Sequence, residues 1–241
     1  MKRAIDKDFD DPVVQQRTGP TIESMWSAEA YALYGPPRDT AHDVALWFDD
    51  HEIEPVLDVG CGTGLFKQSF PRRWVGLDRS IEQLRQGPPG PRVLGDALTL
   101  PFPDETFNGV AALYMLYFFT DPGLVAREAL RVLRPGGAFA TCAPSKFDAP
   151  ELGHVTPTGE RDSFMAEDIP ALLFEHFRDV DVTVWDFPAF DLPDREIVRD
   201  YLFSWYYPQL TLDEAAARAE RVEVPLKLTK RGAWGVGRKP V

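Results

Sequence analysis

The chain has 241 residues, which is enough for one sizeable α/β domain but short for two independent enzymatic cores. Its 44% hydrophobic and 12% aromatic content is that of a packed globular protein, and no apolar run is long enough to cross a bilayer. Its 38 acidic and 26 basic residues give a net charge of −12, which would repel a nucleic-acid backbone. We therefore expect a soluble protein that binds neither membranes nor nucleic acid.

The first fifty residues are expected to lie outside the main sheet. Residues 1–20 are charged and aperiodic, which predicts a mobile tail, and they lack the apolar stretch of a secretory signal, which favours the cytoplasm. Residues 21–50 carry two helical patterns, one through Trp26 and Leu33 and one through Val44 and Phe48. We expect these two helices to cap the body of the protein.

From residue 51 onward, short apolar segments alternate with helical patterns. This alternation is typical of a parallel sheet covered by helices on both faces. The predicted strands are 55–59, 74–77, 91–94, 108–113 and 137–142, and the predicted helices are 65–70, 80–86 and 122–133. We expect Pro135-Gly136-Gly137 to end the last of these helices and to turn the chain into the next strand.

The C-terminal part, residues 145–241, is predicted to complete the same single domain. A helix is expected at 166–177, followed by strands at 180–185 and 233–238. Between these strands, Ile197, Tyr201 and Trp205 recur at four-residue spacing, which predicts a helical insertion at about 190–222. We expect that insertion to cap one end of the sheet.

A glycine-rich loop follows the first predicted strand, in the segment Val56-Leu57-Asp58-Val59-Gly60-Cys61-Gly62-Thr63-Gly64. Glycine allows a tight turn at positive φ and removes the Cβ that would keep a ligand away from the backbone. The helix after the loop directs free N–H groups toward whatever lies there. The segment therefore predicts a ligand-binding crevice.

Two carboxylates indicate which ligand the crevice suits. Asp78 ends the second strand, about 20 residues after the loop, where an acid commonly accepts hydrogen bonds from both hydroxyls of an unphosphorylated ribose. Its alternative role is that of a helix N-cap. Asp58 lies two residues before the first glycine, where it would repel a pyrophosphate and suit a cation. The spacing also differs from the G-x-G-x-x-G of dinucleotide sites. S-adenosylmethionine, with a sulfonium and no phosphate, meets these requirements.

Four segments in order make residues 28–144 resemble the class I S-adenosylmethionine-dependent methyltransferases, in particular the type 11 domain of enzymes similar to those of ubiquinone and menaquinone biosynthesis. The segments are the glycine loop, Asp78, Gly95-Asp96-Ala97 followed by Leu100-Pro101-Phe102-Pro103-Asp104-Glu105-Thr106-Phe107-Asn108, and Leu130-Arg131-Val132-Leu133-Arg134-Pro135-Gly136-Gly137.

The resemblance implies a Rossmann-like, doubly wound, seven-stranded sheet that is mostly parallel, with an antiparallel last strand and helices on both faces. It implies S-adenosylmethionine as cofactor and residues 51–144 as the cofactor-binding core. Asp96 would bind the adenine amino group, with Ala97 and Leu98 beside the ring. The methionine part would lie against the backbone of Gly60 and Gly62 and against Leu113 and Tyr114, and Tyr31 would cover the cofactor. The predicted cofactor-binding set is Tyr31, Asp58, Gly60, Cys61, Gly62, Gly64, Asp78, Arg79, Asp96, Ala97, Leu98, Leu113 and Tyr114.

The expected reaction is methyl transfer to a small-molecule acceptor by direct displacement, which needs no metal and no catalytic triad. Where the family often has a histidine after the fourth strand, this chain has Leu116-Tyr117-Phe118. Tyr117 and His154 are candidates for a general base, and Tyr117 is equally compatible with core packing. Asp148 and Glu151, in the same loop as His154, are also candidates. The distant Cys61 and Cys142 predict reduced thiols rather than a metal knuckle.

Several questions stay open in the sequence. The aromatic residues Phe203, Trp205, Tyr206 and Tyr207 would either wall an apolar acceptor pocket or form the insertion's own core. Two alternative functions are a non-catalytic protein that binds S-adenosylmethionine or S-adenosylhomocysteine, and another nucleotide-dependent enzyme such as a dinucleotide oxidoreductase. The sequence indicates neither the acceptor nor the oligomeric state.

Overall fold

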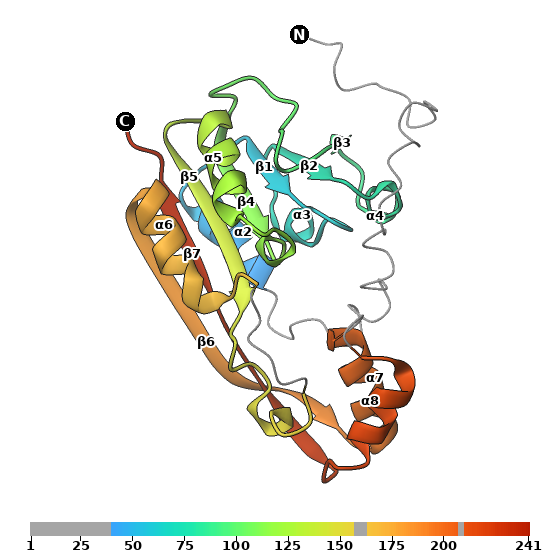
Figure 1. Ribbon diagram of the computed structural model, residues 1–241. Helices are drawn as coiled ribbons and strands as arrows, with labels where there is room; N and C mark the ends of the chain where they lie inside the picture. The colour runs from blue at the N-terminus through green and yellow to red at the C-terminus, as the bar shows by residue number, and fades with distance from the viewer. Residues whose placement is uncertain (1–39, 157–162, 207–209) are drawn as a thin grey trace.

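A computed structural model describes residues 40–156, 163–206 and 210–241 (Figure 1). Seven strands form one sheet in the order β3-β2-β1-β4-β5-β7-β6. Neighbours from β3 to β5 are parallel, whereas β7 is antiparallel to both β5 and β6. This arrangement confirms the expected fold class. The strands are β1 (Val56–Val59), β2 (Trp74–Asp78), β3 (Arg92–Leu94), β4 (Phe107–Leu113), β5 (Leu133–Pro144), β6 (Arg178–Leu192) and β7 (Leu226–Arg238).

Helices cover both faces of this sheet because its central strands are apolar on both sides. Alternate residues of a strand point to opposite faces, and in β1 the neighbours Val56 and Leu57 are both fully buried, in different clusters. The cluster of Leu57 is closed by α5 (Pro122–Val132) and α6 (Ile169–His176). The cluster of Val56 is closed by α2 (Thr40–Asp50), α3 (Leu65–Ser69) and α4 (Ile81–Gln86).

The order of the strands reverses between β1 and β4, which lie side by side at the centre (Figure 1). In open α/β sheets the crevice at such a reversal, beyond the carboxyl ends of the strands, is the usual ligand site. The glycine loop leaves β1 at this end, and the 3₁₀ turn η3 (Leu116–Phe118) follows β4 there. The fold therefore places the candidate site at the carboxyl edge of β1, β2 and β4.

Three predicted boundaries at the C-terminal side are wrong. Helix α5 ends at Val132, and the segment with Pro135-Gly136-Gly137 belongs to the start of β5, because Leu133 already pairs with Phe107 of β4. Strands β6 and β7 extend well beyond the predicted 180–185 and 233–238. Their extra length is a two-stranded ribbon that pairs Asp186 with Arg231 and Leu192 with Leu226, beyond the last pair that joins β7 to β5.

A second small core lies at the end of this ribbon, where α7 (Arg195–Tyr206) and α8 (Leu212–Ala219) occupy the predicted insertion (Figure 1). We call it the distal unit, and it also includes the 3₁₀ turn η4 (Pro150–Leu152). Another 3₁₀ turn, η5 (Ala166–Asp168), precedes α6. The buried residues of the distal unit are Ala149, Leu152, Val155, Leu192, Val198, Tyr201, Leu202, Leu210, Ala215, Ala219, Val222 and Leu228.

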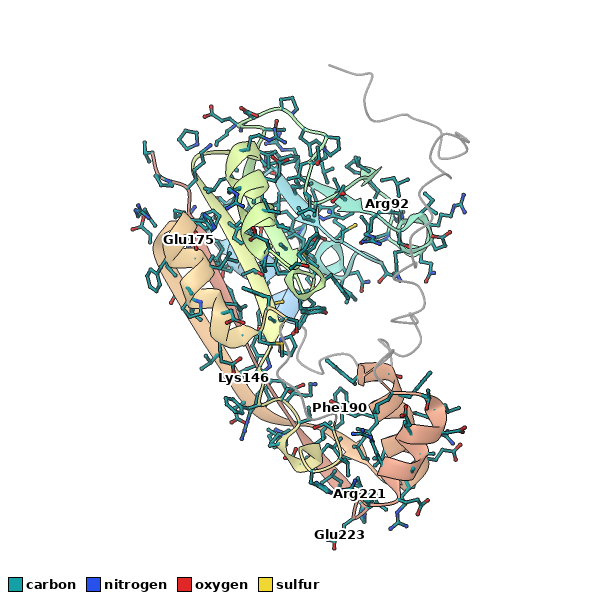
Figure 2. All side chains as sticks on the ribbon, viewed as in Figure 1. Arg92, Lys146, Glu175, Phe190, Arg221 and Glu223 are labelled. Atoms are coloured by element: carbon teal, nitrogen blue, oxygen red, sulfur yellow. The ribbon has the colours of Figure 1, made fainter. Side chains whose placement is uncertain are left out.

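Aromatic side chains of the insertion pack into this core. Phe203 and Trp205 are partly buried against it, and Phe190 of β6 lies beside α7 (Figure 2). Of the two interpretations of the aromatic cluster, packing within the insertion therefore accounts for these two members. The side chain of Tyr206 and all of Tyr207 lie outside the described residues, as do the predicted tail, the first capping helix and Tyr31. The second predicted capping helix corresponds to α2.

Candidate functional site

The glycine loop adopts a backbone that only glycine takes readily. Gly60, Gly62 and Gly64 have φ values of 69°, 51° and 80°, in the left-handed region. The amides of Gly60 and Cys61 donate to the Leu77 carbonyl of β2 at 2.7 and 3.0 Å, so the loop folds back onto the neighbouring strand. A Cβ at Gly64 would lie 2.6 Å from Pro88 Cδ, a direct clash. The loop is thus compact and fixed by its backbone.

Gly62 is the position that leaves room for a ligand. Among the described residues, a Cβ there would meet one protein atom within contact range, Gln83 Oε1 at 3.9 Å. Gly60, by contrast, is closed by Met115, which a Cβ would approach to 3.1 Å. The left-handed φ of Gly62 therefore exposes backbone to open space, which is the condition for close approach of a bound molecule.

Asp78 is tied to this loop. Its Oδ2 accepts a hydrogen bond from the Gly62 amide at 2.8 Å, and its Oδ1 accepts one from the Ser80 amide at 2.8 Å. Burial raises the pKa of Asp78, although the hydrogen bonds from Ser80 and Gly62 act in the opposite direction. Each carboxylate oxygen has a second lone pair, so the group can still accept from two hydroxyls. The N-cap of α4 is Ser80, so Asp78 does not serve as that cap.

Asp58 lies beneath the loop and is almost fully buried. Its Oδ2 accepts a hydrogen bond from Trp74 Nε1 at 3.4 Å. Burial raises the pKa of Asp58 to about 7, and the nearby charge of Asp78 adds to the rise. Cys61 is buried beside it, and burial raises the pKa of its thiol, so this cysteine is no activated nucleophile. The structure thus places Asp58 behind the loop rather than in open space.

The predicted adenine side forms a tight turn after β3. Asp96 Oδ1 accepts from the Leu98 amide at 2.9 Å, and the Asp96 carbonyl accepts from the Thr99 amide at 3.1 Å. Gly95 donates to the Asp78 carbonyl at 3.0 Å, so the turn begins beside Asp78. Asp96 and Leu98 are exposed, whereas Ala97 is buried. The structure therefore brings together the glycine loop, Asp78 and the Asp96 turn; Arg79, next to Asp78, is exposed.

Leu113 and Tyr114 lie at the end of β4, on the other side of β1 from Asp78. Tyr114 has a φ of 53°, a strained value for a residue with a side chain. Its amide donates to the Cys142 carbonyl at 3.1 Å, and its hydroxyl donates to Thr40 Oγ1 at 3.1 Å. The first residue of α2 is therefore held at the end of β4, beside the glycine loop.

The two candidate bases lie in different surroundings: Tyr117 belongs to η3, after β4, and His154 to the distal unit. Tyr117 is half-buried, contacts Phe118 ring to ring at 4.6 Å and packs on the core that α5 and α6 cover. His154 is exposed, with Nε2 3.4 Å from the Arg221 carbonyl in the distal unit. Tyr117 therefore contributes to core packing, and a role for it or for His154 as a base stays a prediction.

Asp148 and Glu151 instead fasten the segment after β5 to the outer half of β7. Asp148 pairs with the buried Lys230 and accepts from the Arg231 amide at 2.7 Å. Glu151 accepts from the hydroxyl and the amide of Thr229 at 2.5 and 3.1 Å. Burial acts to raise the pKa of Glu151, but the bonds from Thr229 outweigh it and hold the pKa below its ordinary value.

Sequence reasoning missed several side chains that shape the site: Trp74, Gln83, Met115 and Arg92. Arg92, labelled in Figure 2, donates to the Gly87 carbonyl at 3.0 Å and also to the Leu84 carbonyl, and so holds the end of α4 near the loop. None of the four has a local sequence signal, because each acts across a strand or helix boundary. In the described part of the chain, no three His, Cys, Asp or Glu side chains are grouped to bind a metal ion. The same residues contain no helix with the length and hydropathy of a membrane span.

A seven-stranded sheet in this order, with a glycine loop after its first strand and an acid at the end of its second, is a Rossmann-like fold. Residues 57–141 match the family described as "Methyltransferase domain". The YcgJ protein of Bacillus subtilis has the same fold, with a TM-score of 0.59 and 19% identity over 83% of this chain and 99% of that one. Residues 57–141 are therefore similar to a methyltransferase domain, as expected, and that match implies S-adenosylmethionine as cofactor.

Two curated relatives extend the comparison. The demethylmenaquinone methyltransferase of Roseiflexus castenholzii is 40% identical over 147 residues, which are 55% of this chain and 56% of that protein. The malonyl-[acyl-carrier protein] O-methyltransferase of Yersinia pestis is 33% identical over 137 residues, or 53% of this chain and 51% of that protein. The chain thus spans about half the length of these relatives.

Proposed function

We propose that this protein transfers a methyl group from S-adenosylmethionine to a small-molecule acceptor. The observation that carries the proposal is the glycine loop: Gly62 exposes backbone to open space while its amide is bonded to Asp78. An acid that is fixed to the loop and keeps free lone pairs suits ribose hydroxyls at the same crevice. The methyltransferase domain match over residues 57–141 covers this loop, Asp78 and the Asp96 turn.

In this proposal each part of the crevice binds a different part of the cofactor. Asp78 accepts hydrogen bonds from the ribose, and the turn of Asp96, Ala97 and Leu98 binds the adenine. The backbone of Gly60 and Gly62, with Leu113 and Tyr114, contacts the amino-acid end. Asp58, buried behind the loop, provides negative potential there when it is ionised. Tyr31 keeps its predicted role as a cover.

The chemistry asked of the protein is positioning. When bound, S-adenosylmethionine supplies a methyl group that its sulfonium has already activated. The chain's residues would align donor and acceptor and exclude water, so displacement needs no triad.

A small organic acceptor is favoured over a nucleic acid. The net charge of −12 opposes a phosphate backbone. The two relatives are named for methylation of demethylmenaquinone and of malonyl-[acyl-carrier protein], which supports an organic acceptor without identifying it. The segment after β5 and the distal unit, which lie outside the matched residues, are the regions that would distinguish one acceptor from another.

The test is a calorimetric titration of the whole protein with S-adenosylmethionine, S-adenosylhomocysteine and NAD in parallel. We expect micromolar binding of the first two and none of NAD. Gly62→Val should abolish that binding, because a branched side chain would occupy the open space, while Gly153→Ala, far from the loop, should leave it intact. Binding of NAD alone would favour the dinucleotide enzyme. Cofactor binding without turnover over a broad acceptor panel would favour the non-catalytic protein.

A further inference from the structure

Arg131, in the last turn of α5, holds the segment that follows the Asp96 turn. Its guanidinium donates to the carbonyls of Leu100 and Phe102 at 2.9 and 2.8 Å. It also donates to Asp104 Oδ1 at 2.8 Å and to both oxygens of Glu128, each at 2.8 Å. One side chain thus binds three successive points of a segment about thirty residues away.

Glu128, one helical turn earlier, completes this clamp. Its Oε2 accepts a hydrogen bond from the Leu100 amide at 2.8 Å, while the pair with Arg131 keeps its charge in place. The hydrogen bond from Arg131 holds the pKa of Glu128 below its ordinary value. Both backbone groups of Leu100 are therefore bonded to side chains of α5.

The clamped segment has little other regular structure. Between β3 and β4 it forms only the isolated bridge between Asp96 and Thr99. Its far end is joined to α5 by the Glu105 and Thr106 amides, which donate to the carbonyls of Arg131 and Val132 at 3.0 and 2.8 Å. Apolar side chains of α5 also pack in the same buried cluster as Leu100, but in the described part of the chain the side-chain hydrogen bonds between α5 and this stretch come from Arg131 and Glu128.

We infer that Arg131 and Glu128 are positioning residues that hold the Asp96 turn ready for adenine, and so raise cofactor affinity without touching the cofactor. The inference rests on the proposed function. A turn that is correctly placed for only a tenth of the time would weaken the apparent affinity tenfold. The clamp gives a physical role to Arg131 in the segment that begins at Leu130, which resembles the family although it lies outside the glycine loop.

The planar guanidinium is required because its donors point in fixed, divergent directions. Lysine keeps the charge but is a point donor, so it cannot bind two carbonyls and two carboxylates together. Arg131→Lys should therefore rescue little of the affinity lost in Arg131→Met. Glu128→Gln keeps an acceptor for the Leu100 amide and should fall between the wild type and Arg131→Met.

The test compares Arg131→Met with Arg127→Met on the same helix. Arg127 pairs with Asp121 at 3.4 Å, and both side chains are more than half exposed, so it is a matched arginine that lies outside the clamp. S-adenosylhomocysteine and adenosine are titrated calorimetrically. We expect Arg131→Met to weaken the binding of both ligands about tenfold or more. The factor should be the same for the two, because both carry adenine. Arg127→Met should leave the affinity for both ligands unchanged.

A second readout separates positioning from general loss of stability. In the ligand-free protein, Arg131→Met should speed amide hydrogen exchange at Leu98, Thr99 and Leu100 but not in β1 or β4, and saturating S-adenosylhomocysteine should slow it again. Wild-type affinity and exchange in Arg131→Met would overturn the inference. If Arg131→Met does not fold, Glu128→Gln decides by the same two readouts. If the wild type binds neither S-adenosylhomocysteine nor adenosine, the proposed function fails. Amide hydrogen exchange in the ligand-free protein then still tests whether Arg131 and Glu128 hold the segment in place.

Discussion

The cofactor crevice and the distal unit are built in different ways. The crevice is formed largely by backbone groups: three left-handed glycines, amides that donate to Asp78, and a turn closed by a hydrogen bond to Asp96. The distal unit depends on buried side chains, since Lys230 and Asp148 pair within its apolar core and Glu151 binds Thr229. Only the crevice falls within the matched residues 57–141.

This difference indicates how the two halves of the proposed reaction can vary. A crevice made from backbone tolerates change in its surroundings as long as the glycines and two acids remain. A unit that depends on a buried ion pair is sensitive to single side-chain changes, because losing one partner leaves the other charged in an apolar core. The glycine loop and its acids lie in the part of the chain that matches the family, and the distal unit lies outside that match.

Lys230→Met should have the largest effect, on the distal unit. Lys230 is 3% exposed, and its ammonium bonds Asp148, lies 3.2 Å from the Tyr201 hydroxyl and 3.6 Å from the centroid of a Trp205 ring. Removing it leaves a buried unpaired carboxylate, so we expect a loss of about 3–5 kcal/mol in urea unfolding. Lys230→Met with Asp148→Asn should recover much of this, and Arg195→Ala, which breaks an exposed pair with Glu220, should cost less than about 1 kcal/mol. Equal costs for Lys230→Met and Arg195→Ala would show that the buried pair stabilises the distal unit no more than an exposed pair does.

The pH dependence of stability should reveal the buried acid of the crevice. The pKa of Asp58 is raised from 3.8 to about 7 when the protein is folded. Between these values the folded state keeps a proton that the unfolded state releases, so stability falls as pH rises from about 4 to 7, by up to roughly 4 kcal/mol. Asp58→Asn should remove this contribution; Asp78, whose pKa is also raised, adds to the fall, whereas Glu128 and Glu151, whose pKa values are lowered, oppose it. The same pH dependence of stability in the wild type and in Asp58→Asn between about pH 4 and 7 would contradict the burial of Asp58.

Asp78→Ala should weaken cofactor binding by roughly 1.5–3 kcal/mol, because it removes charge-assisted hydrogen bonds and frees the Gly62 amide. The measurement is titration with S-adenosylhomocysteine. Asp186→Ala, an exposed acid on β6 paired with Arg231, is the matched control and should bind normally. An unchanged affinity in folded Asp78→Ala would remove Asp78 from the proposed site.

The smallest effect is expected at the start of α8, in the distal unit. Thr211 accepts from the Glu214 amide through its hydroxyl, and Glu214 accepts from the Thr211 amide, which forms a capping box. Thr211→Ala should lower stability by about 1 kcal/mol in thermal unfolding, and Thr211→Ser should retain the cap. A loss as large as that of Lys230→Met would show that the helix end, rather than the buried pair, limits the stability of this unit.

Strands β1 to β4 were predictable because each is a short apolar run between turn residues, as in the buried segment of Val56 and Leu57. The long ribbon of β6 and β7 was not. Along β6 the alternation of exposed and partly buried residues breaks at Thr183 and Val184, which are both exposed, and Pro188 interrupts the segment further on. Its pairing with β7, rather than local hydrophobicity, continues the strand to Leu192.

The candidate site shows the same division between features that follow from local residue patterns and features that depend on distant contacts. Gly60, Gly62, Gly64, Asp78 and Asp96 could be found because their backbone roles follow from residue type and spacing. That Asp58 lies behind the loop could not be read from spacing, since its burial depends on Trp74 of the next strand. Likewise, Asp148 and Glu151 looked like candidate bases, and their bonds to Lys230 and Thr229 connect residues about eighty positions apart.

The sequence by itself determined the fold class, the position of the glycine loop and the methyltransferase resemblance, because these depend on periodicity and on conformations open to glycine alone. Tertiary structure decided which acids are buried, which arginine bonds to the segment after the Asp96 turn, and how the side chains of the insertion pack in the distal unit. The physical reason is that burial and hydrogen-bond partners depend on contacts between segments far apart in the chain, and local residue patterns carry little information about them.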